Sequence, residues 1–261
     1  MKSLEANPPP TYGSRRGGNM YCDTTYGNLV HRIGQALESG RAVKFWEPAR
    51  LVRGSLEYKI RHPGAVEDAP ALIAQAMRTV VGIHAGALTL ESFEPLATTI
   101  NQNTSLIRSR VRQVNDRTTR KASNPAYCEA VSDRLREHLR SADALFIVLG
   151  HGGITAGSLT YIDYIGKKRA SESTIYPVRF STDKAKDVEP QVSPREVVYL
   201  QKLVAERSCV VVYDEDYASG KTLKRATAFF NELLDTETVP VANVGYTTTS
   251  PLVGAKALAA V

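Results

Sequence analysis

The segment Cys209–Leu223 constrains the fold most, because it joins an apolar run to a group of acids and then to a helix start. The run Cys209–Tyr213 is apolar throughout, which is typical of a parallel strand covered on both faces. Acids and then small residues follow, and a helical pattern extends from about Lys221 to Leu234. This order predicts a strand, a loop and a helix, the repeating unit of a parallel α/β sheet.

Strands and helices alternate over the second half of the chain. A capping box at Ser193–Glu196, with proline at the first helical position, predicts a helix from Pro194 to about Glu206. The alternation predicts an α/β domain with a doubly wound, mainly parallel sheet over residues 126–261. The other expected elements are a helix at Tyr127–Leu139, a helix ending near Ile165, and strands at Ala144–Leu149, Thr174–Phe180 and Val239–Tyr246.

The first half of the chain has a different pattern. Residues 1–24 are rich in proline, glycine and serine, and we expect a flexible tail. Residues 25–125 show mainly helical periodicity, which predicts an N-terminal accessory or hood region. Its expected helices are Asn28–Leu37, Ala69–Val81, Ser92–Ile100 and Leu106–Val114.

The residues after the strand Cys209–Tyr213 have the chemistry of a sugar phosphate site. Acids at a strand tip can accept hydrogen bonds from paired ribose hydroxyls, and the amides of Ala218–Thr222 can surround a phosphate. A P-loop would need glycine at position 215, where this chain has Glu215. The alternative is a solvated acidic turn. The residue order favours a ribose 5-phosphate site.

This segment resembles the phosphoribosyl-pyrophosphate (PRPP) signature of type I phosphoribosyltransferases. That signature has four apolar residues, two acids, two mostly apolar positions, one variable position and then Thr/Ser-Gly-x-Thr. Asp214 and Glu215 match the acid pair, which the resemblance assigns to the ribose hydroxyls and to catalysis. It assigns the ribose 5-phosphate to the whole run of Asp214, Glu215, Asp216, Tyr217, Ala218, Ser219, Gly220, Lys221 and Thr222.

A second apolar strand, Phe146–Leu149, ends in glycines. It resembles the pyrophosphate loop of the same family, with His151 where the family has arginine or lysine. His151, Gly152 and Gly153 would then hold the diphosphate, since glycines allow the backbone a close approach. A dinucleotide fingerprint is the alternative, but Thr155 stands at its third glycine position.

The resemblance implies a type I phosphoribosyltransferase-like fold and a magnesium-dependent pentosyltransferase of nucleotide metabolism. Its substrates would be PRPP and a small acceptor, a nucleobase or another nitrogen compound that the sequence does not identify. Mg²⁺ would be held through the diphosphate and water. The polar stretch Ser181–Val192 would be a lid, with Lys184 and Lys186 as catalytic residues closing over the diphosphate. We also expect a homodimer.

The charge of the chain leaves a second class of function open. The net charge is +6, and basic residues dominate Arg108–Lys121. This patch is a solvated helix face or an anion contact. In the second case the protein would be a catalytically weak regulator that senses PRPP or a nucleotide and binds RNA or DNA. Three scattered cysteines and no long apolar stretch predict a cytoplasmic protein without a membrane segment.

Overall fold

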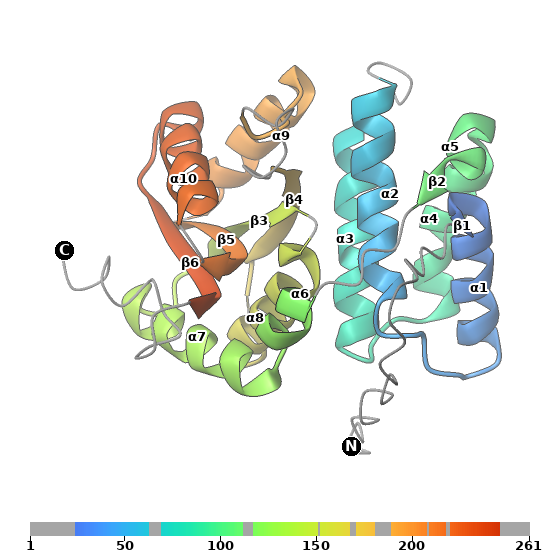
Figure 1. Cartoon of the computed structure of the whole chain (residues 1–261), viewed down its shortest axis with the longest axis horizontal. Coiled ribbons are helices and arrows are strands. Elements are labelled where there is room, and N and C mark those ends of the chain that lie inside the picture. The colour runs from blue at the N-terminus through green and yellow to red at the C-terminus, as the bar shows by residue number, and fades with distance from the viewer. Residues whose placement is uncertain are drawn as a thin grey trace, which may run out of the picture.

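The computed structural model describes residues 24–62, 69–111, 117–150, 152–167, 171–180, 189–207, 209–217 and 220–245. Its centre is a four-stranded sheet with all neighbouring strands parallel, in the order β4-β3-β5-β6 (Figure 1). The strands are β3 (Ala144–Gly150), β4 (Thr174–Arg179), β5 (Cys209–Tyr217) and β6 (Thr238–Gly245). The predicted α/β class with a parallel sheet is confirmed, and the layout is compatible with a doubly wound fold.

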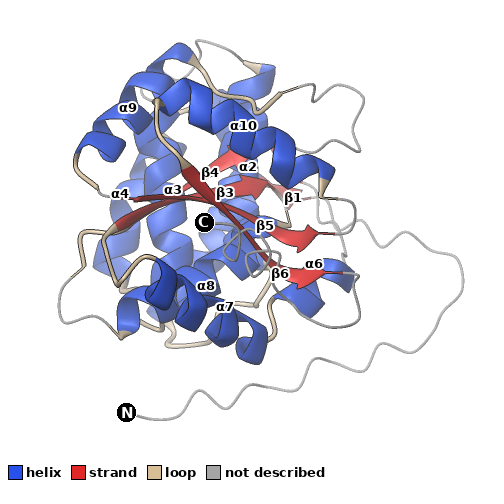
Figure 2. Cartoon of the chain, turned by 90° about the vertical axis from the view of Figure 1, so that its left-hand side faces the viewer, coloured by secondary structure: helices blue, strands red, loops and turns tan. Residues whose placement is uncertain are grey.

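Helices cover both faces of this sheet. Figure 2 shows α9 (Pro194–Ala205) and α10 (Lys221–Leu234) on one face, with α7 (Pro125–His138) and α8 (Gly153–Gly166) on the other. β3 and the central part of β5 are fully buried because both faces are covered. This explains the apolar runs from which both strands were predicted.

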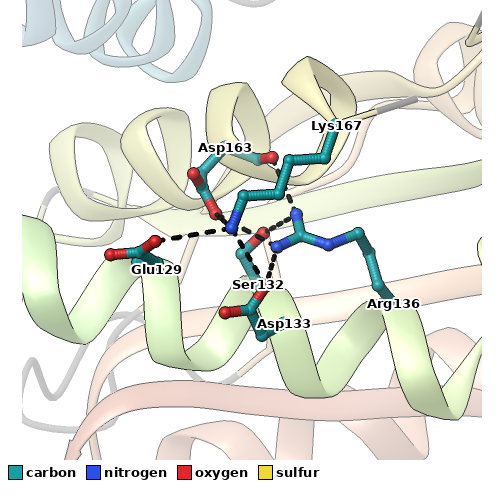
Figure 3. Close-up of polar contacts among 6 residues, drawn as sticks. All are labelled: Glu129, Ser132, Asp133, Arg136, Asp163 and Lys167. Atoms are coloured by element: carbon teal, nitrogen blue, oxygen red, sulfur yellow. Dashed lines mark hydrogen bonds and ion pairs between the residues drawn. The ribbon is translucent and has the colours of Figure 1, made fainter. Parts of the chain in front are cut away.

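The polar cluster in Figure 3 joins α7 to α8. Arg136 donates to the Ser132 hydroxyl at 2.6 Å and to the backbone carbonyl of Asp163 at 2.8 Å, and it also contacts Asp133. Lys167 lies 3.1 Å from Asp133, 3.4 Å from Glu129 and 4.0 Å from Asp163. The hydrogen bond from Lys167 lowers the pKa of the exposed Asp133. The cluster holds the C-terminal end of α8 against α7.

Helices dominate the described residues that precede α7. They are α1 (Tyr26–Glu38), α2 (Glu47–Arg61), α3 (Ala69–His84), α4 (Leu90–Asn101), α5 (Thr104–Arg108) and α6 (Arg117–Ala122). The strands β1 (Thr24–Thr25) and β2 (Arg110–Val111) pair antiparallel beside them. α2 and α3 stand side by side next to β4, whereas α6 contacts β5, β6 and α8. No helix within the described ranges combines the length and the apolar character needed to cross a membrane.

The helix predicted at Leu106–Val114 is wrong. α5 ends at Arg108, Ser109 is extended, and its hydroxyl donates to the carbonyl of Leu106 at 2.7 Å. The chain then pairs with β1, which buries Val111. The last residues of the predicted helix lie outside the described ranges.

A buried ion pair connects the helical region to the sheet. The Lys59 ammonium of α2 donates to both carboxylate oxygens of Glu196 at 2.8 and 2.9 Å, and to the carbonyl of Gln191 at 2.8 Å. Tyr176 of β4 donates to the same carboxylate at 3.0 Å. Glu196 also completes the predicted capping box by accepting from Ser193. Burial lowers the pKa of Lys59, and the charge of Glu196 opposes that shift.

We expect Lys59→Met to lower the free energy of unfolding by about 3–5 kcal/mol, because it leaves a fully buried carboxylate without its ammonium partner. Chemical denaturation of the purified protein measures this loss. The matched control is Lys202→Met on α9, whose side chain is exposed and should change stability by less than about 0.5 kcal/mol. Equal effects of the two variants would contradict a stabilising role for the ion pair.

Candidate functional site

The two strand ends singled out in the sequence are neighbours. β3 lies between β4 and β5, and the last pair in the β3–β5 register is Val148 with Tyr213. From β3 the chain continues to β4 on one side and then to β5 on the other side of β3. The direction of the strand order therefore reverses between β3 and β5. Ligands of open parallel sheets bind outside the carboxyl ends of strands at such a reversal.

Glu215 connects the two junctions directly. Its half-buried carboxylate lies so close to Gly152 that a Cβ on Gly152 would overlap it. A Cβ on Gly153 would be 3.7 Å from Glu215 Oε2 and 3.6 Å from the carbonyl oxygen of Tyr213. The carboxylate therefore lies at the N-terminus of α8, where the helix dipole favours negative charge.

Asp214 and Glu215 differ in orientation. β5 continues to Tyr217, four residues beyond its predicted end, because it pairs with β6 through Asp214, Asp216 and Tyr217. Successive side chains of a strand point to opposite faces, so Asp214 points away from the face on which Glu215 meets Gly152. Asp214 Oδ1 accepts the backbone N–H of Glu215 at 3.0 Å. Their joint action on a ribose stays a prediction.

The described part of the expected 5-phosphate loop is Gly220 and the start of α10. Gly220 has a φ of +66°, a left-handed conformation that favours glycine, and a Cβ there would overlap the ring of Tyr217. Tyr217 is 37% exposed, so one part of its ring covers the helix start and another faces solvent. Lys221 and Thr222 lie in the first turn, where amides point outward from the helix.

Several predicted site residues lie outside the described ranges. They are His151, Lys184, Lys186, Ala218 and Ser219. Their assignments to the diphosphate, the lid and the 5-phosphate stay predictions.

The basic stretch Arg108–Lys121 is divided among different elements. Arg108 belongs to α5 and Arg110 to β2, whereas Arg120 and Lys121 belong to α6. α5 contacts α1 and α4, and α6 contacts the sheet, so the two ends of the stretch are apart in Figure 1. These four side chains are exposed. Of the described residues in this stretch, those of α6 adjoin the candidate site through β5.

A charged stripe on α2 was missed in the sequence. Arg50, Arg53, Glu57 and Arg61 recur at spacings of three and four, which places them on one helix face. Arg53, Glu57 and Arg179 of β4 are mutually close, and all three are largely buried. The spacing was the available signal, although a stripe of charges usually indicates a solvated face.

The described residues contain no group of three or more His, Cys, Asp or Glu side chains arranged to hold a metal ion. No protein-family model, curated protein or solved structure matches the chain. The residues of the two junctions and their geometry are therefore the basis for a functional assignment.

Two glycine variants test this geometry. Gly157→Ala places a Cβ 2.6 Å from Val148 Cγ1 and 3.0 Å from the Tyr213 ring. Such overpacking costs about 1–3 kcal/mol, and the short contact with a buried strand favours the upper end. For Gly152→Ala the three nearest atoms all belong to the movable carboxylate of Glu215, so we expect a stability change within about 0.5 kcal/mol. Thermal unfolding compares them, and an equal loss in both variants would refute the placement of Glu215.

Proposed function

We propose that the protein is a magnesium-dependent transferase that moves the 5-phosphoribosyl group of PRPP to a nitrogen acceptor and releases pyrophosphate. The observation that carries this proposal is the contact of Glu215 with Gly152 at the point where the strand order reverses. Two segments that separately resemble donor-binding motifs of one family are thereby adjacent, although more than 60 residues separate them in the chain.

The order of groups along the sheet edge supports the same donor. The start of α10 suits the 5-phosphate, the β5 acids suit the ribose hydroxyls, and the glycines before α8 suit the diphosphate. This is also the order of these groups in PRPP. Tyr217 lies over the first of these positions and shields one side of it from solvent.

In the proposed reaction the bond from the anomeric carbon to the diphosphate oxygen breaks, and the diphosphate leaves with the electron pair. A bond from that carbon to the acceptor nitrogen forms, and the nitrogen loses a proton. The ribose becomes electron-poor in between, so nearby carboxylates stabilise it. Asp214 and Glu215 are the candidates for this role.

The residues present are compatible with Mg²⁺ that arrives on the diphosphate. Glu215 has an oxygen donor beside Gly152, and Mg²⁺ prefers oxygen ligands and retains several waters. Glu215 would help to hold the ion, and bound Mg²⁺ would supply positive charge that stabilises the leaving diphosphate. Lys184, Lys186 and His151 remain the proposed cationic contributors from the chain.

We expect the double variant Asp214→Ala/Glu215→Ala to lose magnesium-dependent pyrophosphate release by at least about 100-fold, because removal of groups that stabilise developing charge has this effect. Release is measured with PRPP and a panel of nucleobases and amines, and circular dichroism checks the fold. Glu232→Ala, an exposed acid on α10, is the control. Full turnover by the double variant would rule out this assignment.

The second candidate is a ligand-sensing regulator that binds RNA or DNA. It is favoured by the contact of α6, with its exposed Arg120 and Lys121, against β5 of the candidate site. If this function holds, nucleic acid affinity should fall steeply with salt, because phosphate contacts release counterions. The affinity for nucleic acid should also be lower in the double variant Arg120→Gln/Lys121→Gln than in the wild type. A titration without salt dependence would exclude this candidate.

A further inference from the structure

Three guanidinium groups share one carboxylate at the boundary between α2 and the sheet. Arg53 Nε donates to Glu57 Oε1 at 2.9 Å, and Arg179 Nη1 lies 3.9 Å from the same oxygen. Arg61 Nη2 donates to Glu57 Oε2 at 3.2 Å. The side chains of Arg53, Glu57 and Arg179 are only 11%, 9% and 15% exposed, whereas that of Arg61 is 51% exposed. Arg53 and Arg179 thus form an enclosed pair of cations.

This pair adjoins the candidate diphosphate loop. Arg179 is the last residue of β4, and its register partner is Gly150, the last residue of β3. A Cβ on Gly150 would lie 3.6 Å from Leu56 Cδ1 of α2 and 3.7 Å from the Cα of Arg179. α2, β3 and β4 therefore meet two residues before Gly152.

The position in the strand order indicates which part of the donor the pair would meet. β5 and α10 provide the candidate positions for the ribose and its 5-phosphate, and β3 and α8 provide that for the diphosphate. β4 is the next strand beyond β3. The most highly charged part of the donor would therefore face Arg53 and Arg179.

The charge of the loop itself also suggests additional cations. The basic position of the loop holds His151, where the family that the loop resembles has arginine or lysine. Guanidinium groups stay charged at every physiological pH, and their planar fork matches pairs of phosphate oxygens. An enclosed site also weakens the competition of water for those oxygens.

We propose that Arg53 and Arg179 bind the diphosphate of the donor, so that α2 of the helical region contributes to the donor site and not only to an acceptor hood. Glu57 is a positioning residue in this arrangement, because both guanidinium groups contact its Oε1. The inference rests on the proposed phosphoribosyl transfer for the identity of the ligand. The choice of Arg53 and Arg179 rests on their contacts with Glu57 and does not depend on the proposed reaction.

The test is calorimetric titration of the full chain with two separate probes, magnesium pyrophosphate and ribose 5-phosphate. We expect Arg53→Gln and Arg179→Gln each to weaken pyrophosphate binding by about tenfold or more, since each removes a charge-assisted hydrogen bond. Affinity for ribose 5-phosphate should change by less than about twofold. Arg61→Gln is the matched control, because it contacts the same carboxylate from an exposed position.

A folding defect is separated from a binding defect in two ways. Thermal unfolding is recorded for each variant, and Arg53→Lys keeps the charge while it removes the planar fork. Arg53→Lys should bind pyrophosphate more tightly than Arg53→Gln and more weakly than the wild type. Equal affinity of these three proteins would overturn the inference.

The remaining outcomes distinguish the inference from the proposed function. If pyrophosphate binds the wild type and the Arg53 and Arg179 variants equally while ribose 5-phosphate binds, the inference fails and the proposed function stands. If pyrophosphate binding depends on both arginines but ribose 5-phosphate does not bind, the inferred anion site stands and the proposed function fails. If pyrophosphate does not bind the wild type, the inference is overturned.

Discussion

The buried ion pair between Lys59 and Glu196 is the interaction on which the arrangement of this protein depends. Removing two charges from water is costly, and the cost is offset only by close geometry and additional hydrogen bonds. Tyr176 and Gln191 supply those bonds. The amide of Gln191 also donates to the carbonyl of Arg179 at 2.8 Å. One contact thus orients α2, the end of β4 and the start of α9 relative to one another.

The topology of the sheet explains why distant segments meet. Parallel strands bring all their carboxyl ends to one side of the sheet. Because the strand order reverses between β3 and β5, these two strands are direct neighbours. The glycines after β3 and the acids of β5 therefore lie next to each other. Gly157 permits a close approach of α8 to Val148 and Tyr213, which sets the height of the helix over the sheet. The position of Glu215 beside Gly152 follows from that packing.

Strands and caps of the second half could be predicted because each depends on local chemistry, as in the apolar run of β3 and the capping box of α9. α2 could not be predicted in this way, because its charged residues Arg50, Arg53 and Glu57 are buried. A stripe of charges in a sequence usually indicates a solvated helix face. The helix prediction at Leu106–Val114 failed because an apolar residue such as Val111 fits the pattern of an amphipathic helix and that of a short strand equally well. The contact of Glu215 with Gly152 requires the strand order, and the opposed orientation of Asp214 requires the full length of β5.

The coverage of β4 also affects how copies of this chain can associate. An open strand edge exposes unpaired backbone groups to which another strand can add. On the outer side of β4, α2 and α3 pack against the strand, and Gln191 forms a backbone bridge to Arg179. Sheet extension from one subunit into another is therefore blocked on this side. β6 is the other edge strand of the four-stranded sheet.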